Sequence, residues 1–84
     1  MSKDGLDFPL VYEIKIIMIN FERNKDILSA LFQKLKITFS EVSSVPSKNN
    51  TYTSYTYKVK IPTKQLFDDL YTCLAKLPEV KMAI

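Results

Sequence analysis

Apolar and polar residues alternate along the segment that begins at Leu10. Every second residue of this segment is large and apolar: Tyr12, Ile14, Ile16 and Met18. Because successive side chains of a strand point to opposite faces of a sheet, this period of two predicts a strand with one face in the core. Ile17 and Ile19 occupy the other phase, so we expect an interior strand that is partly covered on both faces.

The apolar residues that follow recur every three or four positions, which is the spacing of one face of a helix. They are Ile27, Leu28, Leu31, Phe32 and Leu35. We expect Asn24 to cap the amino end, and Asp26 to lie in the first turn near the positive end of the helix dipole. Lys34 and Lys36 lie at the other end, where cations are favoured. The pattern therefore predicts a first helix after Asn24.

Residues 37–61 return to a strand-like pattern with a turn in the middle. The segment from Ile37 to Val45 is diluted by serines, which favours an edge strand that can carry a bulge. Pro46 to Asn50 has turn chemistry, and either asparagine can adopt the left-handed conformation. Thr51 to Ile61 is the strongest strand of the chain, so we predict a hairpin. We expect one phase of this strand in the core: Tyr55, Tyr57, Val59 and Ile61.

A second helix is predicted between Thr63, which we expect to be its N-cap, and Pro78, which ends it. Its apolar stripe consists of Leu66, Phe67, Leu70, Tyr71, Leu74 and Leu77. Cys73 falls at the edge of that stripe, so we interpret it as a small buried hydrophobic residue and not as a reactive thiol. Alternation in the last segment, Val80 to Ile84, predicts a short final strand.

This order, β-α-β-β-α-β, predicts an α+β fold, the ferredoxin-like sandwich. Right-handed crossovers arrange such a chain into a four-stranded antiparallel sheet of order 4-1-3-2 with both helices on one face. We expect residues 1–8 to form a flexible tail and residues 9–84 to form a single domain. The sheet face without helices is predicted to carry Glu13, Lys15, Ile17, Ser54, Thr56, Lys58, Lys60, Lys81 and Ala83.

Composition excludes most catalytic chemistry. The 84 residues include no His, no Trp and one Cys, so neither a zinc cluster, an internal disulfide nor a His-based catalytic pair can be assembled. A hydrophobic content of 46% with a single Gly is typical of a packed globular chain. We therefore expect a module that is not an enzyme and that needs no cofactor or metal.

Charge and hydropathy bear on the compartment and the partner. The formal net charge is +3, and the lysines are spread along the chain among acidic residues, which favours a solvated surface over a nucleic-acid footprint. The longest apolar run, Ile16 to Ile19, is far below the roughly 18 residues of a membrane span. The amino terminus has no signal-peptide pattern, and a lone thiol agrees with a reducing cytoplasm. We expect a cytoplasmic protein without membrane contact.

Three segments carry a resemblance to a known family: Asp7-Phe8-Pro9, the stretch from Pro46 to Ser54, and the ending from Leu77 to Ile84. Together they resemble YbeD-like proteins, which are small uncharacterised bacterial proteins with a ferredoxin-like, ACT-resembling fold. Pro46, Ser47 and Tyr52 match the family's Pro-Ser-Ser-Lys-Gly-Asn-Tyr pattern, whereas the four residues between Ser47 and Tyr52 depart from it. The resemblance implies a bacterial cytoplasmic protein and a regulatory or interaction domain similar to amino-acid-sensing ACT modules.

The first functional hypothesis is an ACT-like regulatory or protein-interaction module. It would bind a protein partner or a small-molecule effector, and it could pair edge to edge as a homodimer. ACT modules place effectors near the loop after the first strand, here Asn20 to Asn24, and often use a Gly there. Because the single Gly is Gly5, we favour a protein partner over a metabolite. The candidate interaction surface consists of Lys15, Thr56, Lys58, Lys60, Pro46, Ser47 and Tyr52.

Two alternatives come from other functional classes. RNA-recognition modules share this topology and stack bases on exposed aromatics, and here the lysines of the open face could hold phosphates. We place Tyr55 and Tyr57 in the core, however, so Tyr52 alone would be left for stacking. Acylphosphatases also share the fold, and Arg23 lies between Asn20 and Asn24, but no glycine is present to bring backbone amides onto a phosphate. We interpret Arg23 as a solvated turn residue.

Overall fold

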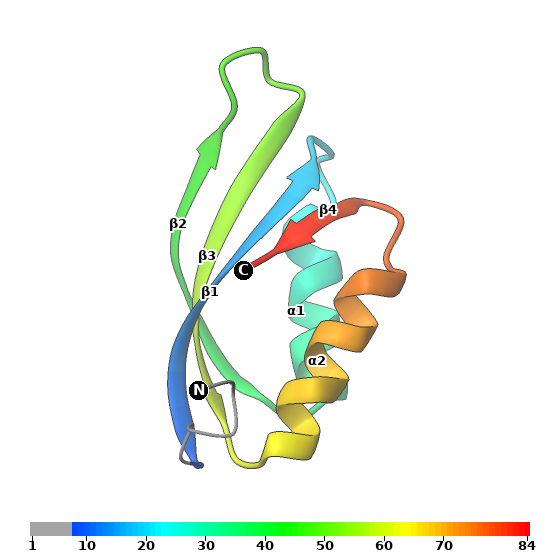
Figure 1. Ribbon diagram of the computed structural model, residues 1–84. Coiled ribbons are helices and arrows are strands. Elements are labelled where there is room, and N and C mark those ends of the chain that lie inside the picture. Colours follow the sequence, from blue (N-terminus) through cyan, green and yellow to red (C-terminus); the bar gives the residue numbers. More distant parts are fainter. Residues whose placement is uncertain (1–7) are drawn as a thin grey trace.

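The computed structural model describes residues 8–84, which form one sheet and two helices in the order β1-α1-β2-β3-α2-β4 (Figure 1). The elements are β1 Leu10–Ile19, α1 Asn24–Lys34, β2 Thr38–Pro46, β3 Tyr52–Ile61, α2 Lys64–Lys76 and β4 Val80–Ala83. Each predicted element is present, and the ends differ from the predicted ones by a few residues at most.

The four strands form one antiparallel sheet of order β2-β3-β1-β4. Counted from the other edge, this order is the predicted 4-1-3-2. Both helices lie on the same side of the sheet (Figure 1). The two most apolar strands, β1 and β3, are the central pair and run side by side over their whole lengths. The predicted ferredoxin-like α+β sandwich is confirmed.

The core lies between the sheet and the helices, and the phase of β3 determines what it contains. Tyr55 and Tyr57 are only 5% and 2% exposed, so the predicted facing of this strand is confirmed. The Tyr57 ring lies 5.2 Å from the ring of Phe32 on α1, between ring centroids. The other buried apolar residues come from both layers: Ile14, Ile16, Met18, Leu28, Phe32, Ile37, Val59, Ile61, Phe67, Leu70 and Leu74.

The two helices begin in different ways. In α2 the hydroxyl of Thr63 accepts a hydrogen bond from the backbone N–H of Leu66 at 3.2 Å, so the predicted cap is confirmed. In α1 the residue before the helix is Arg23, which makes no side-chain cap, and Asn24 is the first helical residue. The prediction that Asn24 caps α1 is therefore wrong, because its side chain is buried and donates to groups outside the helix.

The β2–β3 hairpin has the features that its sequence predicts. β2 is an edge strand, and its register against β3 shifts between Glu41 and Ser43, which is the expected bulge. Asn50 has a φ of 58°, the left-handed conformation that asparagine tolerates better than most residues. Two hydrogen bonds close the turn: the N–H of Ser47 donates to the carbonyl of Tyr52, and the N–H of Tyr52 donates to the hydroxyl of Ser47.

β4 departs from the predicted alternation because its register against β1 shifts between Ile17 and Met18. Met82 lies opposite Ile17, and Val80 lies opposite Met18, so Lys81 is an extra residue in this strand. Ala83 lies opposite the buried Ile16 and packs against the core. The placement of Ala83 on the open face is therefore wrong, and Met82 takes its place there.

The start of the chain lies mostly outside the described residues. Of the predicted tail, residues 1–7 are not described. The Phe8 ring packs edge-on against the Phe67 ring of α2, with 6.0 Å between ring centroids.

The phase of β3 can be tested by paired substitutions. We expect Tyr57→Ala to lower the free energy of unfolding by about 3–5 kcal/mol, because it removes an aromatic ring from the core. Lys58→Ala removes an exposed side chain from the next position and should change it by less than about 0.5 kcal/mol. Urea unfolding followed by circular dichroism measures both values. Equal small effects would contradict the buried placement of Tyr57.

The buried phenols predict a loss of stability at alkaline pH. Burial raises the pKa of Tyr57 above its ordinary 10.0, and the charge of Glu41 raises it further. Burial and then a hydrogen bond to the Tyr12 hydroxyl raise the pKa of Tyr71. The folded state therefore keeps protons that the unfolded chain loses, so this contribution is intact below pH 10 and is lost as the pH rises above it.

Urea unfolding across the range from about pH 9 to pH 11 measures this effect. The double variant Tyr57→Phe/Tyr71→Phe, which lacks both phenols, should show a shallower fall in the free energy of unfolding. A wild-type slope no steeper than that of the double variant would contradict the prediction.

Candidate functional site

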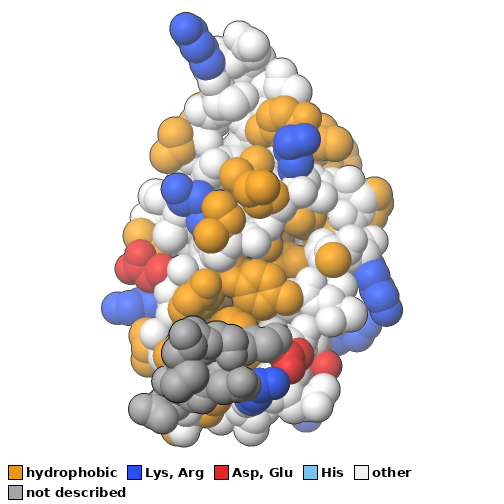
Figure 2. All heavy atoms as spheres, in the orientation of Figure 1, with side chains coloured by type: hydrophobic (Ala, Val, Ile, Leu, Met, Phe, Trp, Pro, Cys, Tyr) orange, Lys and Arg blue, Asp and Glu red, His pale blue; other side chains and the backbone are white. Residues whose placement is uncertain are grey.

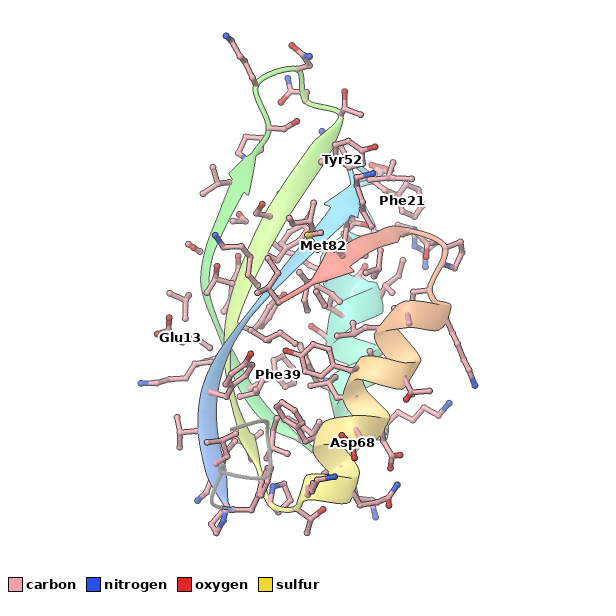
Figure 3. All side chains as sticks on the ribbon, in the orientation of Figure 1. Glu13, Phe21, Phe39, Tyr52, Asp68 and Met82 are labelled. Atoms are coloured by element: carbon pink, nitrogen blue, oxygen red, sulfur yellow. The ribbon has the colours of Figure 1, made fainter. Side chains whose placement is uncertain are left out.

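One face of the sheet has no helix over it, and the strand registers place its residues in rows. In the side-chain view, Glu13 points away from the helices on this face, whereas Phe39 lies between the sheet and the helices (Figure 3). The outward residues of the two central strands are paired as Ile19–Tyr52, Ile17–Ser54, Lys15–Thr56, Glu13–Lys58 and Val11–Lys60. The edge strands extend these rows. The open face is therefore a continuous surface across four strands.

The rows near the carboxyl end of β1 form an apolar half of this face. Met82 and Val45 extend the Ile17 row on either side, and the backbone of Ile84 exchanges two hydrogen bonds with that of Lys15. The apolar half thus consists of Ile17, Ile19, Val45, Tyr52, Met82 and Ile84. Four of these side chains are about half exposed or more: Ile19 50%, Val45 59%, Met82 49% and Ile84 60%. Clusters of exposed apolar residues mark interaction sites in many proteins.

The space-filling view shows hydrophobic side chains along β1 and β4, with lysines beside them (Figure 2). Lys81 lies against the apolar half, because its Nζ is 5.3 Å from the centroid of the Tyr52 ring. This cation–π contact covers the ring that the RNA-binding hypothesis needs for stacking.

The rows near the amino end of β1 form a basic half, in which Lys15, Lys58 and Lys60 face outward. All three are exposed. Glu13 is the one acidic residue in these rows of β1 and β3, and it lies opposite Lys58. The open face is thus apolar toward one end and mainly positive toward the other, where Val11 is also exposed.

The candidate residues from the sequence divide into two groups. Lys15, Thr56, Lys58, Lys60 and Tyr52 share the open face. Pro46 lies opposite Thr53, which faces the helix side, so Pro46 is not part of this surface. The hydroxyl of Ser47 accepts the hydrogen bond that closes the hairpin and so has a structural role.

Sequence reasoning missed Met82, Ile84 and Val45 as members of the surface. The bulge in β4 shifts the phase of Met82, and no residue in that segment signals a bulge. Val45 lies in the edge strand β2, and Ile84 directly follows the edge strand β4. At such positions only the pairing with a neighbouring strand shows which face a side chain occupies. Ile17 and Ile19 were predicted to be partly covered, yet Ile19 is half exposed.

A shallow hollow of about 320 Å³ adjoins the apolar half at the end of β1. It is lined by Ile19, Asn20, Phe21, Pro78 and Glu79. Phe21, which is 43% exposed, lies at the same end of the molecule as Tyr52 and Met82 (Figure 3). This hollow lies beside the β1–α1 loop, and it continues the apolar surface around the end of the sheet.

The two asparagines on either side of Arg23, Asn20 and Asn24, both make hydrogen bonds to other parts of the chain. The amide of Asn20 donates to the carbonyl of Asn50 at 3.0 Å and accepts from the Thr53 hydroxyl at 3.2 Å. Asn24 is fully buried, and its Nδ2 donates to the carbonyl of Ile19 at 2.8 Å and to the Tyr55 hydroxyl at 3.3 Å. These bonds fasten the β1–α1 loop to the hairpin and the sheet.

Residues 8–84 contain neither a cluster of metal ligands nor a helix that could span a membrane. Within residues 8–84, no three His, Cys, Asp or Glu side chains lie together as metal ligands would. Cys73 is partly exposed on α2. Neither described helix is long and apolar enough to cross a membrane.

Asn24 should matter for stability. Asn24→Ala removes the donor to the carbonyl of Ile19, and we expect it to lower the free energy of unfolding by about 1–3 kcal/mol. Asn24→Asp should cost more at pH 7, because it puts an unpaired charge into a fully buried site. Thermal and urea unfolding measure both variants. An aspartate variant as stable as wild type would contradict this account.

Comparisons with known proteins give two matches. A model of a protein family described as "Protein of unknown function (DUF493)" matches residues 3–84. Among solved structures, the solution structure of protein HP0495 from H. pylori is similar, with a TM-score of 0.74 and 14% sequence identity. The match covers 100% of this chain and 94% of that chain, and at this identity it shows a shared fold. The search of curated proteins found no match.

Proposed function

This chain belongs to the DUF493 family, and we propose that it is a non-catalytic protein-interaction module of regulatory, ACT-like type. The family is the group of uncharacterised proteins that the YbeD-like resemblance indicated. Its partner binds on the open face of the sheet. The observation that carries the proposal is the apolar half, in which Ile19, Val45, Met82 and Ile84 are about half exposed or more on one continuous surface.

The exposed apolar area favours a macromolecular partner. Burying apolar surface contributes about 25 cal/mol per Å², so covering several large side chains together yields a substantial gain. Small-molecule sites are concave and enclose most of their ligand, whereas the sheet face is a broad surface and the hollow beside Phe21 is shallow. A protein surface is the partner that can cover the whole apolar half at once.

RNA binding receives less support. RNA-recognition sheets stack bases on outward aromatic residues, and the buried Tyr55 and Tyr57 cannot serve in this way. Among the aromatics of the described strands, Tyr52 alone lies on the open face, and Lys81 lies over its ring.

Photo-crosslinking from two positions tests the proposal. A photoreactive amino acid replaces Thr56 in the middle of the open face, and in a matched variant it replaces Thr72, an exposed residue of α2. We expect a discrete protein adduct from position 56 in native bacterial cells and none from position 72. Met82→Glu should suppress the adduct, because it introduces a charge into the apolar half. Adducts of equal strength from both positions, or an adduct that ribonuclease removes, would refute the proposal.

A further inference from the structure

We propose that the partner segment is an amphipathic α-helix that is apolar toward one end and acidic toward the other, and that it lies along the strands of the open face. This inference rests on the proposed function and adds the chemical class and the direction of the partner segment. It follows from the backbone geometry of the face, from its charge and from its length.

A helix satisfies the backbone requirement. A segment that lies flat on the face of a sheet cannot pair its N–H and C=O groups with the strands below, because their hydrogen bonds lie within the sheet plane. A helix bonds its own backbone, whereas an extended segment would leave its groups unpaired where they become buried. The opposite face of this sheet is itself covered by helices (Figure 1).

The lysines of the open face indicate that one end of the partner segment is acidic. Lys15, Lys58 and Lys60 point outward from adjacent rows, with Glu13 as the one opposing charge on the central strands. A basic helix would meet like charges there, and a neutral helix would leave the lysines without partners. Asp and Glu side chains complement them, and such complementarity increases both specificity and the rate of association.

The layout of the rows sets the direction and length. The apolar rows run from Ile19 to Ile17, Lys15 and Ile84 share the boundary row, and the basic rows continue to Lys60. From the Ile19 row to the Val11 row the strand advances about 26 Å, at roughly 3.3 Å per residue. A helix of about 18 residues spans this length. Its apolar residues would lie over Ile17 and Met82, and its acidic residues would lie over the lysines.

A second copy of this chain fits the face less well. Two open faces stacked in the same direction would oppose their basic halves. Stacked in opposite directions, they would place the lysines of each copy on the apolar half of the other. Either arrangement buries lysines without acidic partners, which is costly.

Selection from a displayed library of random peptides of about 18 residues tests the inference with defined probes. We expect the enriched peptides to be acidic, with apolar residues at helical spacing gathered toward one end. The best binder is then synthesised, and its affinity is measured against two charge-reversed proteins of equal net charge. Lys58→Glu/Lys60→Glu should weaken binding on the order of tenfold or more. The matched variant Lys34→Glu/Lys76→Glu changes exposed helix lysines and should remain within about twofold of wild type.

The outcomes separate the two proposals. Enrichment of neutral, basic or non-helical peptides, or of none at all, overturns the inference about the helix while the crosslink from position 56 still supports an interaction face. Equal loss of affinity in both charge-reversed proteins also overturns it. A peptide that binds wild type but shifts no methyl resonance of Ile17 or Met82 binds elsewhere and overturns it as well. Absence of the crosslink refutes the proposed function itself.

Discussion

The packing of β3 against the two helices is the constraint on which the rest of the structure depends. Its residues alternate strictly, and a shift of one position would exchange Tyr55 and Tyr57 with the residues of the solvent face. Because Tyr57 packs against Phe32 of α1, the exchange would remove a ring from the core and bury lysines in its place. The phase of this one strand therefore fixes both what stabilises the domain and what it presents to a partner.

The face that this constraint leaves open is unequal along its length. Its apolar half lies where the hairpin, the β1–α1 loop and the start of β4 come together, and hydrogen bonds from Asn20 and Asn24 hold that region in place. The basic half lies on the middle and far rows of the central strands. These bonds and the strands hold the surface in one shape. Binding a partner would therefore cost little conformational entropy in this chain.

Much of this fold could be predicted from sequence, because the strongest signals are local. Alternation identified β1 and β3, three- and four-residue spacing identified α1 and α2, and the turn residues identified the hairpin with its left-handed Asn50. The predictions that failed depend on contacts between distant segments. Asn24 has the sequence features of a cap, but in the fold its amide donates to the carbonyl of Ile19 and the buried hydroxyl of Tyr55. Ala83 has the outward phase by alternation, but the register of β4 against β1 turns it toward the core. The alternation that identified β1 and β3 also placed the lysines of the candidate site on the open face. It did not place the apolar residues on or beside the edge strands, because their facing depends on the register with a neighbouring strand.

The single extra residue in β4, Lys81, changes what the open face presents without setting the facing of Met82. Without Lys81, β4 would pair regularly, with Val80 still opposite Met18 and Met82 still opposite Ile17. The Tyr52 ring would lose the ammonium group that lies 5.3 Å from its centroid. A change of one residue in chain length can thus uncover an aromatic ring on the surface while β1, β3 and both helices stay unchanged. The deletion of one residue in the last strand would therefore keep the architecture and change what the surface offers to a partner.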